Sequence, residues 1–108
     1  GGAADMITGG AENIHPWEIE KLRATHPRVA EVAVVGVADH HWGQRIVACV
    51  VAKGESALSP KELDDFCRNS NLADFKRPKQ YIFLRELPKS AVNKVLRREL
   101  IAAAAQAR

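Results

Sequence analysis

The sequence predicts an α+β domain in which a three-stranded, largely antiparallel sheet packs with helices in two layers, preceded by a short N-terminal strand. Two β-branched and nearly continuous apolar runs, residues 29–37 and 44–52, have the composition of mostly buried strands. A third apolar run, residues 80–84, has the length of a strand. Helical patterns separate these runs, and 108 residues suffice for one small domain with a real core.

The first part of the chain predicts a strand followed by a helix. Residues 5–8 form a brief strand candidate, which the Gly9-Gly10 pair ends. A helix should start with Asn13-Ile14-His15-Pro16, where proline suits the first turn. It should end near Thr25 because the next residue precedes Pro27. Its buried stripe is expected to contain Trp17, Ile19, Leu22 and Arg23.

The remaining elements follow in order. The runs 29–37 and 44–52 are joined by a short loop and should pair antiparallel. Ser59 is a helix N-cap, with proline next and Glu62 completing a capping box. The apolar stripe of that helix is Leu63, Phe66 and Cys67, and a last helix is expected over residues 95–106.

Composition describes an ordinary soluble globular protein, with 46% hydrophobic and 27% charged residues and a net charge of +3. Cys49 and Cys67 lack a CxxC spacing, so buried reduced thiols are expected. The adjacent pair His40-His41 is a poor metal site, because neighbouring side chains rarely converge on one ion. No apolar run reaches the roughly 20 residues of a membrane span and no signal peptide is present, which favours a cytoplasmic protein.

A strongly basic stretch, residues 76–98, sets eight cations against one acid, Glu86. Such a stretch is typical of a solvated face, of a nucleic-acid surface or of a site for another anionic ligand. Arg77-Pro78-Lys79 holds two cations on a stiff turn, and Lys94 lies in a loop that can reach beyond its own domain. Trp42, on a polar turn, either covers the core or offers a flat surface to a ligand. No nucleophile or nucleotide-binding motif is readable, so the domain is not a self-sufficient enzyme.

Four motifs in order resemble the C-terminal domain of the acyl-CoA synthetases, members of the adenylate-forming superfamily: DMITGGAENIHPWEIE, VAEVAVVGVADHHWGQ, LADFKRPKQYIFL and LPKSAVNKVLRREL. The resemblance spans residues 5–100. The details FKRPK, HPWEIE and Asn93 before the lysine look most like the 4-chlorobenzoate–CoA ligase branch. The resemblance implies that residues 5–108 are a C-terminal lid domain and that residues 1–4 are a hinge remnant or linker.

The resemblance implies part of an AMP-forming carboxylic acid–CoA ligase. In that family, ATP and an acid give an acyl-adenylate, and coenzyme A then displaces AMP. The implied cofactors are ATP, with Mg²⁺ held by the N-terminal domain, and coenzyme A. The implied partners are that N-terminal domain, ATP or AMP, coenzyme A and a carboxylic acid, with no nucleic acid and no membrane span. The isolated chain should be inactive.

The resemblance also implies roles for particular residues. Lys94 would be the adenylation lysine, whose ammonium stabilises charge that builds up on the α-phosphate. A second face would bind coenzyme A: backbone at Gly10 and Ala11 would line the pantetheine tunnel, Trp42 and Phe75 would contact the coenzyme A arm, and Arg77 and Lys79 its phosphates.

The sequence departs from the family at two places. The family reads Gly-Arg-x-(Asp or Lys)-Asp at the hinge, where this chain has Gly-Gly-Ala-Ala-Asp, so that Gly2 takes the ribose-contacting position and Ala4 the hinge position. Ala11 replaces the second tunnel glycine and predicts a narrower tunnel. Two alternatives stay open: a lid that acts with a carrier protein, and a basic module for nucleic acid or an acidic protein.

Overall fold

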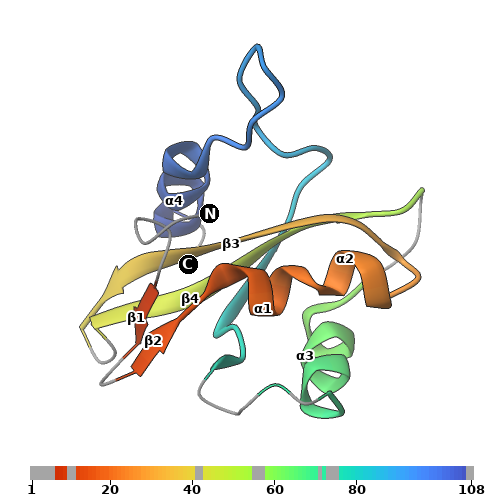
Figure 1. Ribbon diagram of the computed structural model, residues 1–108, viewed down its shortest axis with the longest axis horizontal. Helices are drawn as coiled ribbons and strands as arrows, with labels where there is room; N and C mark the ends of the chain where they lie inside the picture. The colour runs from red at the N-terminus through yellow and green to blue at the C-terminus, as the bar shows by residue number, and fades with distance from the viewer. Residues whose placement is uncertain are drawn as a thin grey trace.

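The computed structural model describes residues 7–9, 12–40, 43–54, 58–70, 72 and 76–106 (Figure 1). The elements in chain order are β1 (Ile7–Gly9), β2 (Glu12–Ile14), α1 (Pro16–Glu20), α2 (Leu22–Thr25), β3 (Val29–Asp39), β4 (Gly43–Ala52), α3 (Pro60–Arg68), β5 (Gln80–Phe83) and α4 (Arg97–Gln106). The predicted α+β class and the three-stranded main sheet are confirmed.

The main sheet has the strand order β3-β4-β5 and is mixed. β3 and β4 pair antiparallel over nearly their whole length, from Val29 opposite Ala52 to Asp39 opposite Gly43. β5 runs parallel to β4, starting with Gln80 opposite Val47. The connection from β4 to β5 contains α3, and a crossover of this kind is what a parallel neighbour requires. The sheet is therefore less antiparallel than the sequence predicted.

A separate two-stranded sheet precedes the helices. β1 pairs antiparallel with β2, from Ile7 opposite Ile14 to Gly9 opposite Glu12. The sequence predicted one N-terminal strand and a helix that starts at Asn13. The structure instead places Asn13 in β2 and begins α1 at Pro16, where proline suits the first turn.

Both faces of the main sheet are covered, so the helices form two outer layers. Alternate residues of β3 point to opposite faces: Val32 and Val34 join one core, Ala33 and Val35 the other. The first core also contains buried residues of α1, α2 and α3, whereas the second contains Leu100 and Ala104 of α4. The layers number three rather than the predicted two, because strands that are apolar on both faces need cover on both.

The predicted helical stripe is right in part. Ile19 and Leu22 are buried, but Trp17 is 57% exposed, with the Lys21 ammonium 4.8 Å from its ring centroid. The prediction for Trp17 was wrong because residues two apart on a helix point to nearly opposite sides, and the side of α1 that faces the core carries Pro16 and Ile19. The Arg23 side chain lies outside the described part.

Local capping signals were read correctly. The Ser59 hydroxyl accepts a hydrogen bond from the Glu62 backbone N–H at 3.1 Å. α2 ends at Thr25 as predicted, and His26 before the proline has an extended backbone. α4 begins at Arg97, two residues after the predicted start. No helix in the described ranges is long and apolar enough to cross a membrane.

Candidate functional site

The predicted site residues that the structure describes lie in two segments of the chain. The Lys94 hairpin (residues 88–96) precedes α4, and the Arg77 turn (residues 76–79) precedes β5. They lie at opposite ends of the molecule in Figure 1, with the hairpin standing clear of the sheet. The other predicted site residues fall outside the described residues: Ala4, Gly10, Ala11, Trp42 and Phe75.

The Lys94 hairpin is held together by its own backbone. The Leu96 N–H donates to the Pro88 carbonyl at 2.9 Å, and the Ser90 N–H donates to the Lys94 carbonyl at 2.8 Å. Between these two hydrogen bonds lies an antiparallel bridge of Lys89 with Val95. The ladder gives the segment a defined shape although it extends into solvent.

Asn93 explains how the hairpin turns. Its φ of 66° is in the left-handed region, where asparagine is tolerated and glycine is most at ease. Its N–H donates to the Ser90 carbonyl at 2.9 Å and closes the turn. Asparagine therefore accommodates the backbone conformation that this turn requires.

Lys94 follows directly on this turn and is exposed. Its backbone N–H donates to the Ser90 hydroxyl at 3.3 Å, which fixes the start of the side chain. Within the part of the chain that the structure describes, no carboxylate pairs with the Lys94 ammonium. The structure thus presents this charge outward from a shaped support.

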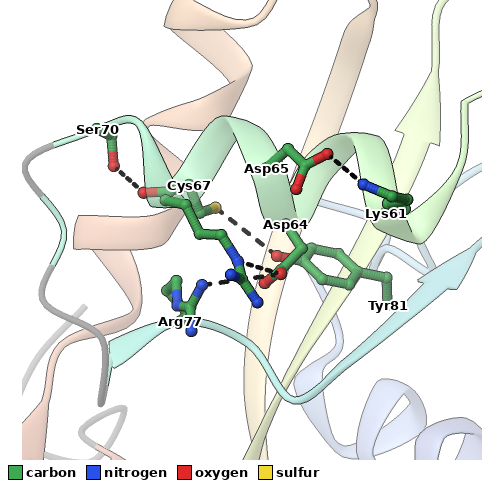
Figure 2. Close-up of polar contacts among 8 residues, drawn as sticks. Lys61, Asp64, Asp65, Cys67, Ser70, Arg77 and Tyr81 are labelled. Atoms are coloured by element: carbon green, nitrogen blue, oxygen red, sulfur yellow. Dashed lines mark hydrogen bonds and ion pairs between the residues drawn. The ribbon is translucent and has the colours of Figure 1, made fainter.

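The Arg77 turn holds its cations differently. Pro78 is buried and anchors the turn. The Arg77 side chain is only 18% exposed, and its Nη1 lies 3.7 Å from Asp64 Oδ2 of α3, which also accepts from Arg68 Nε at 2.9 Å (Figure 2). Lys79 is exposed, and its backbone N–H donates to the Ile46 carbonyl at 2.8 Å. Lys79 therefore reaches solvent more directly than Arg77 does.

Uncharged groups lie behind the Arg77 turn. The Tyr81 hydroxyl donates to Cys67 Sγ at 3.7 Å (Figure 2). Burial raises the pKa of Tyr81 and also that of Cys67, so both are neutral near pH 7. Burial likewise raises the pKa of Cys49 to about 11. Both cysteines are free and buried, as predicted.

Much of the basic stretch is folded against acids from earlier in the chain. Lys76 Nζ lies 2.7 Å from Glu18 Oε1, and this hydrogen bond lowers the pKa of Glu18. Three further ion pairs of this kind are Arg77 with Asp64, Lys89 with Glu31, and Arg97 with Glu20. Among the described residues no group of histidine, cysteine and acidic side chains could hold a metal ion.

Sequence reasoning gave Arg97 and Glu20 no role. It counted Arg97 only among the eight cations of the basic stretch. The structure brings them together, although 77 positions separate them in the chain. No local pattern indicates such a pair, because the contact depends on the packing of α1 and α4 at the same edge of the sheet.

The fold and these two segments together define a small α+β domain that carries exposed lysines on a hairpin and on a turn. The model of the AMP-binding enzyme C-terminal domain matches residues 18–94, and the chain belongs to that family. It is 61% identical over 97 residues to a 4-chlorobenzoate–CoA ligase of Pseudomonas sp. (strain CBS-3), covering 90% of this chain and 18% of that protein. It is 48% identical to a 2-succinylbenzoate–CoA ligase of Bacillus cereus, covering 90% of this chain and 20% of that protein. The chain thus spans about a fifth of the length of these relatives.

Solved structures agree with this assignment. The ATP-bound RpMatB-BxBclM chimera B1 matches with a TM-score of 0.91 and 34% identity, covering 99% of this chain and 22% of that one. The o-succinylbenzoate CoA synthetase of Bacillus subtilis, in complex with its acyl-adenylate intermediate, matches with a TM-score of 0.82 and 40% identity, covering 91% of this chain and 20% of that one.

Proposed function

We propose that the chain is the mobile C-terminal domain of an AMP-forming carboxylic acid–CoA ligase. It acts with an N-terminal domain that holds ATP, Mg²⁺ and the acid. Lys94 serves adenylate formation, and a second face that includes Arg77 and Lys79 binds coenzyme A for thioester formation. Gly10, Ala11, Trp42 and Phe75 complete that second face, and Ala4 takes the hinge position. The predicted cytoplasmic location belongs to the same proposal, since ATP and coenzyme A are its ligands.

The observation that carries the proposal is the exposed Lys94 ammonium on a shaped hairpin. In adenylate formation, a carboxylate oxygen bonds to the α-phosphorus of ATP and the bond from that phosphorus to the bridging oxygen breaks, so that pyrophosphate leaves. Negative charge increases on the phosphate oxygens in the transition state. A cation that is already positioned stabilises this charge without reorganisation.

The Arg77 turn suits the second half-reaction. The thiol of coenzyme A loses its proton and attacks the acyl carbon, and AMP leaves. Lys79 is exposed and Arg77 lies beside it on a turn that Pro78 stiffens, so two cations can meet phosphate groups remote from the reacting sulfur. Binding there positions the thiol rather than taking part in bond making.

An aromatic carboxylate is the acid that we propose. The named acids of two relatives, 4-chlorobenzoate and 2-succinylbenzoate, are both substituted benzoates. This part of the proposal rests on similarity to these relatives.

The test is to measure the two half-reactions separately in the full-length enzyme. ATP–pyrophosphate exchange with benzoate derivatives reports adenylate formation, and release of AMP from a supplied aryl-adenylate with coenzyme A reports thioester formation. We expect both reactions in the full-length enzyme and neither in the 108-residue chain alone. Acyl-adenylate formation by the isolated chain would contradict the proposal.

The alternatives make different predictions for binding. A basic module for nucleic acid should bind a DNA duplex with a steep dependence on salt. The pairing of Lys76, Arg77, Lys89 and Arg97 with acids favours a ligand of small size over a long polyanion. Titration with coenzyme A, with a generic duplex and with an acyl carrier protein separates the three readings.

A further inference from the structure

We propose that Arg97, held by Glu20, is a positioning residue that sets the Lys94 hairpin for adenylate formation. This inference rests on the proposed role of Lys94. Neither residue touches the reacting atoms in the proposal, and both act through the base of the hairpin.

The pair closes the outer edge of β3. β3 is the edge strand of the main sheet, and on its inner side Val34 is registered with Ala48 of β4. On its outer side the Val34 N–H donates to Glu20 Oε2 at 2.9 Å, and the Val34 carbonyl accepts from Arg97 Nη1 at 2.8 Å. Arg97 Nη1 lies 3.1 Å from the same Glu20 oxygen. The ion pair thus takes the hydrogen bonds that a neighbouring strand would make.

Burial and geometry make this pair firmer than an ordinary surface ion pair. The side chains of Arg97 and Glu20 are 31% and 22% exposed. Each also bonds the backbone of Val34, so the three groups form a closed triangle. Exposed pairs contribute little because they hold two flexible side chains in one geometry for one contact. Here both side chains also bond the backbone of one buried strand residue.

The pair is directly connected to Lys94. Arg97 is the first residue of α4, three positions after Lys94, and it lies at the end of the second arm of the hairpin. The first arm is fixed in a similar way, since Lys89 Nζ lies 2.6 Å from Glu31 Oε1 on β3. Because the backbone ladder makes the hairpin one unit, a shift at its base displaces the tip that carries Lys94.

A small displacement is expected to have a large effect on the chemistry. Misplacement of a catalytic group by about 1 Å can cost on the order of 10²-fold in rate. We therefore expect Arg97→Gln in the full-length enzyme to slow adenylate formation by about 10- to 100-fold. Thioester formation from a supplied adenylate should stay unchanged, because it does not use Lys94.

The decisive measurement combines Arg97→Gln with Lys94→Ala. If Arg97 acts through Lys94, Arg97→Gln should cause no further loss of adenylate formation in a protein that already carries Lys94→Ala. Arg97→Lys should keep most of the activity, because a single nitrogen contacts both acceptors in the structure. Glu20→Gln, which keeps an acceptor for the Val34 N–H, should show a smaller loss confined to the same half-reaction. It serves as the test if Arg97→Gln fails to fold.

Lys61→Gln is the matched control, because it removes one cation from an exposed ion pair on α3, with Nζ 2.9 Å from Asp65 Oδ2. It should leave both half-reactions unchanged. The inference would be overturned if Arg97→Gln slowed both half-reactions equally, or if it slowed adenylate formation by the same factor with and without Lys94. Arg97 would then have a purely structural role. A Lys94→Ala variant with full adenylate formation would overturn the proposed function as well, so the two failures are distinguishable.

Discussion

The Lys94 hairpin and the Arg77 turn present positive charge in opposite ways. The hairpin carries its cation at an exposed tip, and the support comes from hydrogen bonds and ion pairs at the base. The turn is anchored by the buried Pro78 and keeps the Arg77 guanidinium largely covered beside Asp64. The contacts that fix the hairpin lie far from the Lys94 ammonium, whereas the contacts that fix the turn lie next to the Arg77 guanidinium.

This difference matters for what each charge can do. Lys94 meets no described carboxylate, so under the proposed function its ammonium can approach the developing phosphate charge without leaving a partner first. Arg77 already pairs with Asp64. A ligand phosphate that binds Arg77 therefore gains only the difference in free energy between its own contact with the guanidinium and the contact of Asp64. The hairpin suits transition-state stabilisation, and the turn suits binding of a phosphate group remote from the chemistry.

The largest expected effect is that of Lys94→Ala. Loss of one charge-stabilising donor typically costs about 10²–10³ in rate, and we expect this loss in adenylate formation. Thioester formation from a supplied adenylate should be spared. Single-turnover rates of the two half-reactions provide the measurement. An equal loss in both would show that the lysine supports the fold, and the contrast between the two segments would disappear.

A smaller effect is expected at the Arg77 turn. Lys79→Ala should raise the apparent KM for coenzyme A by about tenfold, the size of one charge-assisted hydrogen bond. Adenylate formation should be nearly unchanged, and Lys53→Ala, an exposed lysine in the turn after β4, is the control. Arg77→Ala should act in the same direction and also lower the melting temperature, because its side chain is mostly buried. An unchanged KM in both variants would remove the turn from the coenzyme A face.

Local sequence signals predicted the elements of the fold well. The β-branched runs gave β3 and β4, and their pairing followed from the short connection. Ser59 marked the start of α3, and Pro27 marked the end of α2, because capping and proline geometry act over a few residues. The loop that carries Lys94 was also expected, but the left-handed turn at Asn93 was not.

What the sequence did not predict depends on contacts between distant residues. The direction of β5 and the third layer formed by α4 both follow from how whole elements pack. The Glu20–Arg97 pair is of the same kind, because both members read as ordinary surface charges. Lys94, Arg77 and Lys79 stood out within the basic stretch, and the roles that the family resemblance assigns to them stay predictions.

The smallest expected effect concerns pH and the side of the domain that carries the Arg77 turn. His26 is 6% exposed, and its ring meets Phe66 of α3 edge-on with centroids 4.8 Å apart. Its Nδ1 accepts a hydrogen bond from the Arg28 N–H at 3.1 Å. Burial, and then the Arg28 charge, lower the pKa of His26, so the folded state favours the neutral ring. Glu62 Oε2 lies 3.8 Å from His26 Nε2 but also contacts the Arg28 guanidinium. The Glu62 carboxylate therefore does little to stabilise the protonated His26 ring.

The sign of the pH effect follows from this lowered pKa. Below the unfolded pKa of about 6.5 the unfolded chain binds a proton that the folded chain excludes, so stability falls as pH falls until the folded pKa is passed. The melting temperature of the 108-residue chain should therefore decrease as the pH is lowered from 7.5 to 5. His26→Asn should make the melting temperature less dependent on pH in this range. His40→Asn, at an exposed position, should leave it unchanged. If the melting temperature of His26→Asn depends on pH as strongly as that of the unmodified chain, the acid sensitivity arises from other groups. The side of the domain that carries α3 and the Arg77 turn would then differ from the Lys94 hairpin only in how it holds its cations.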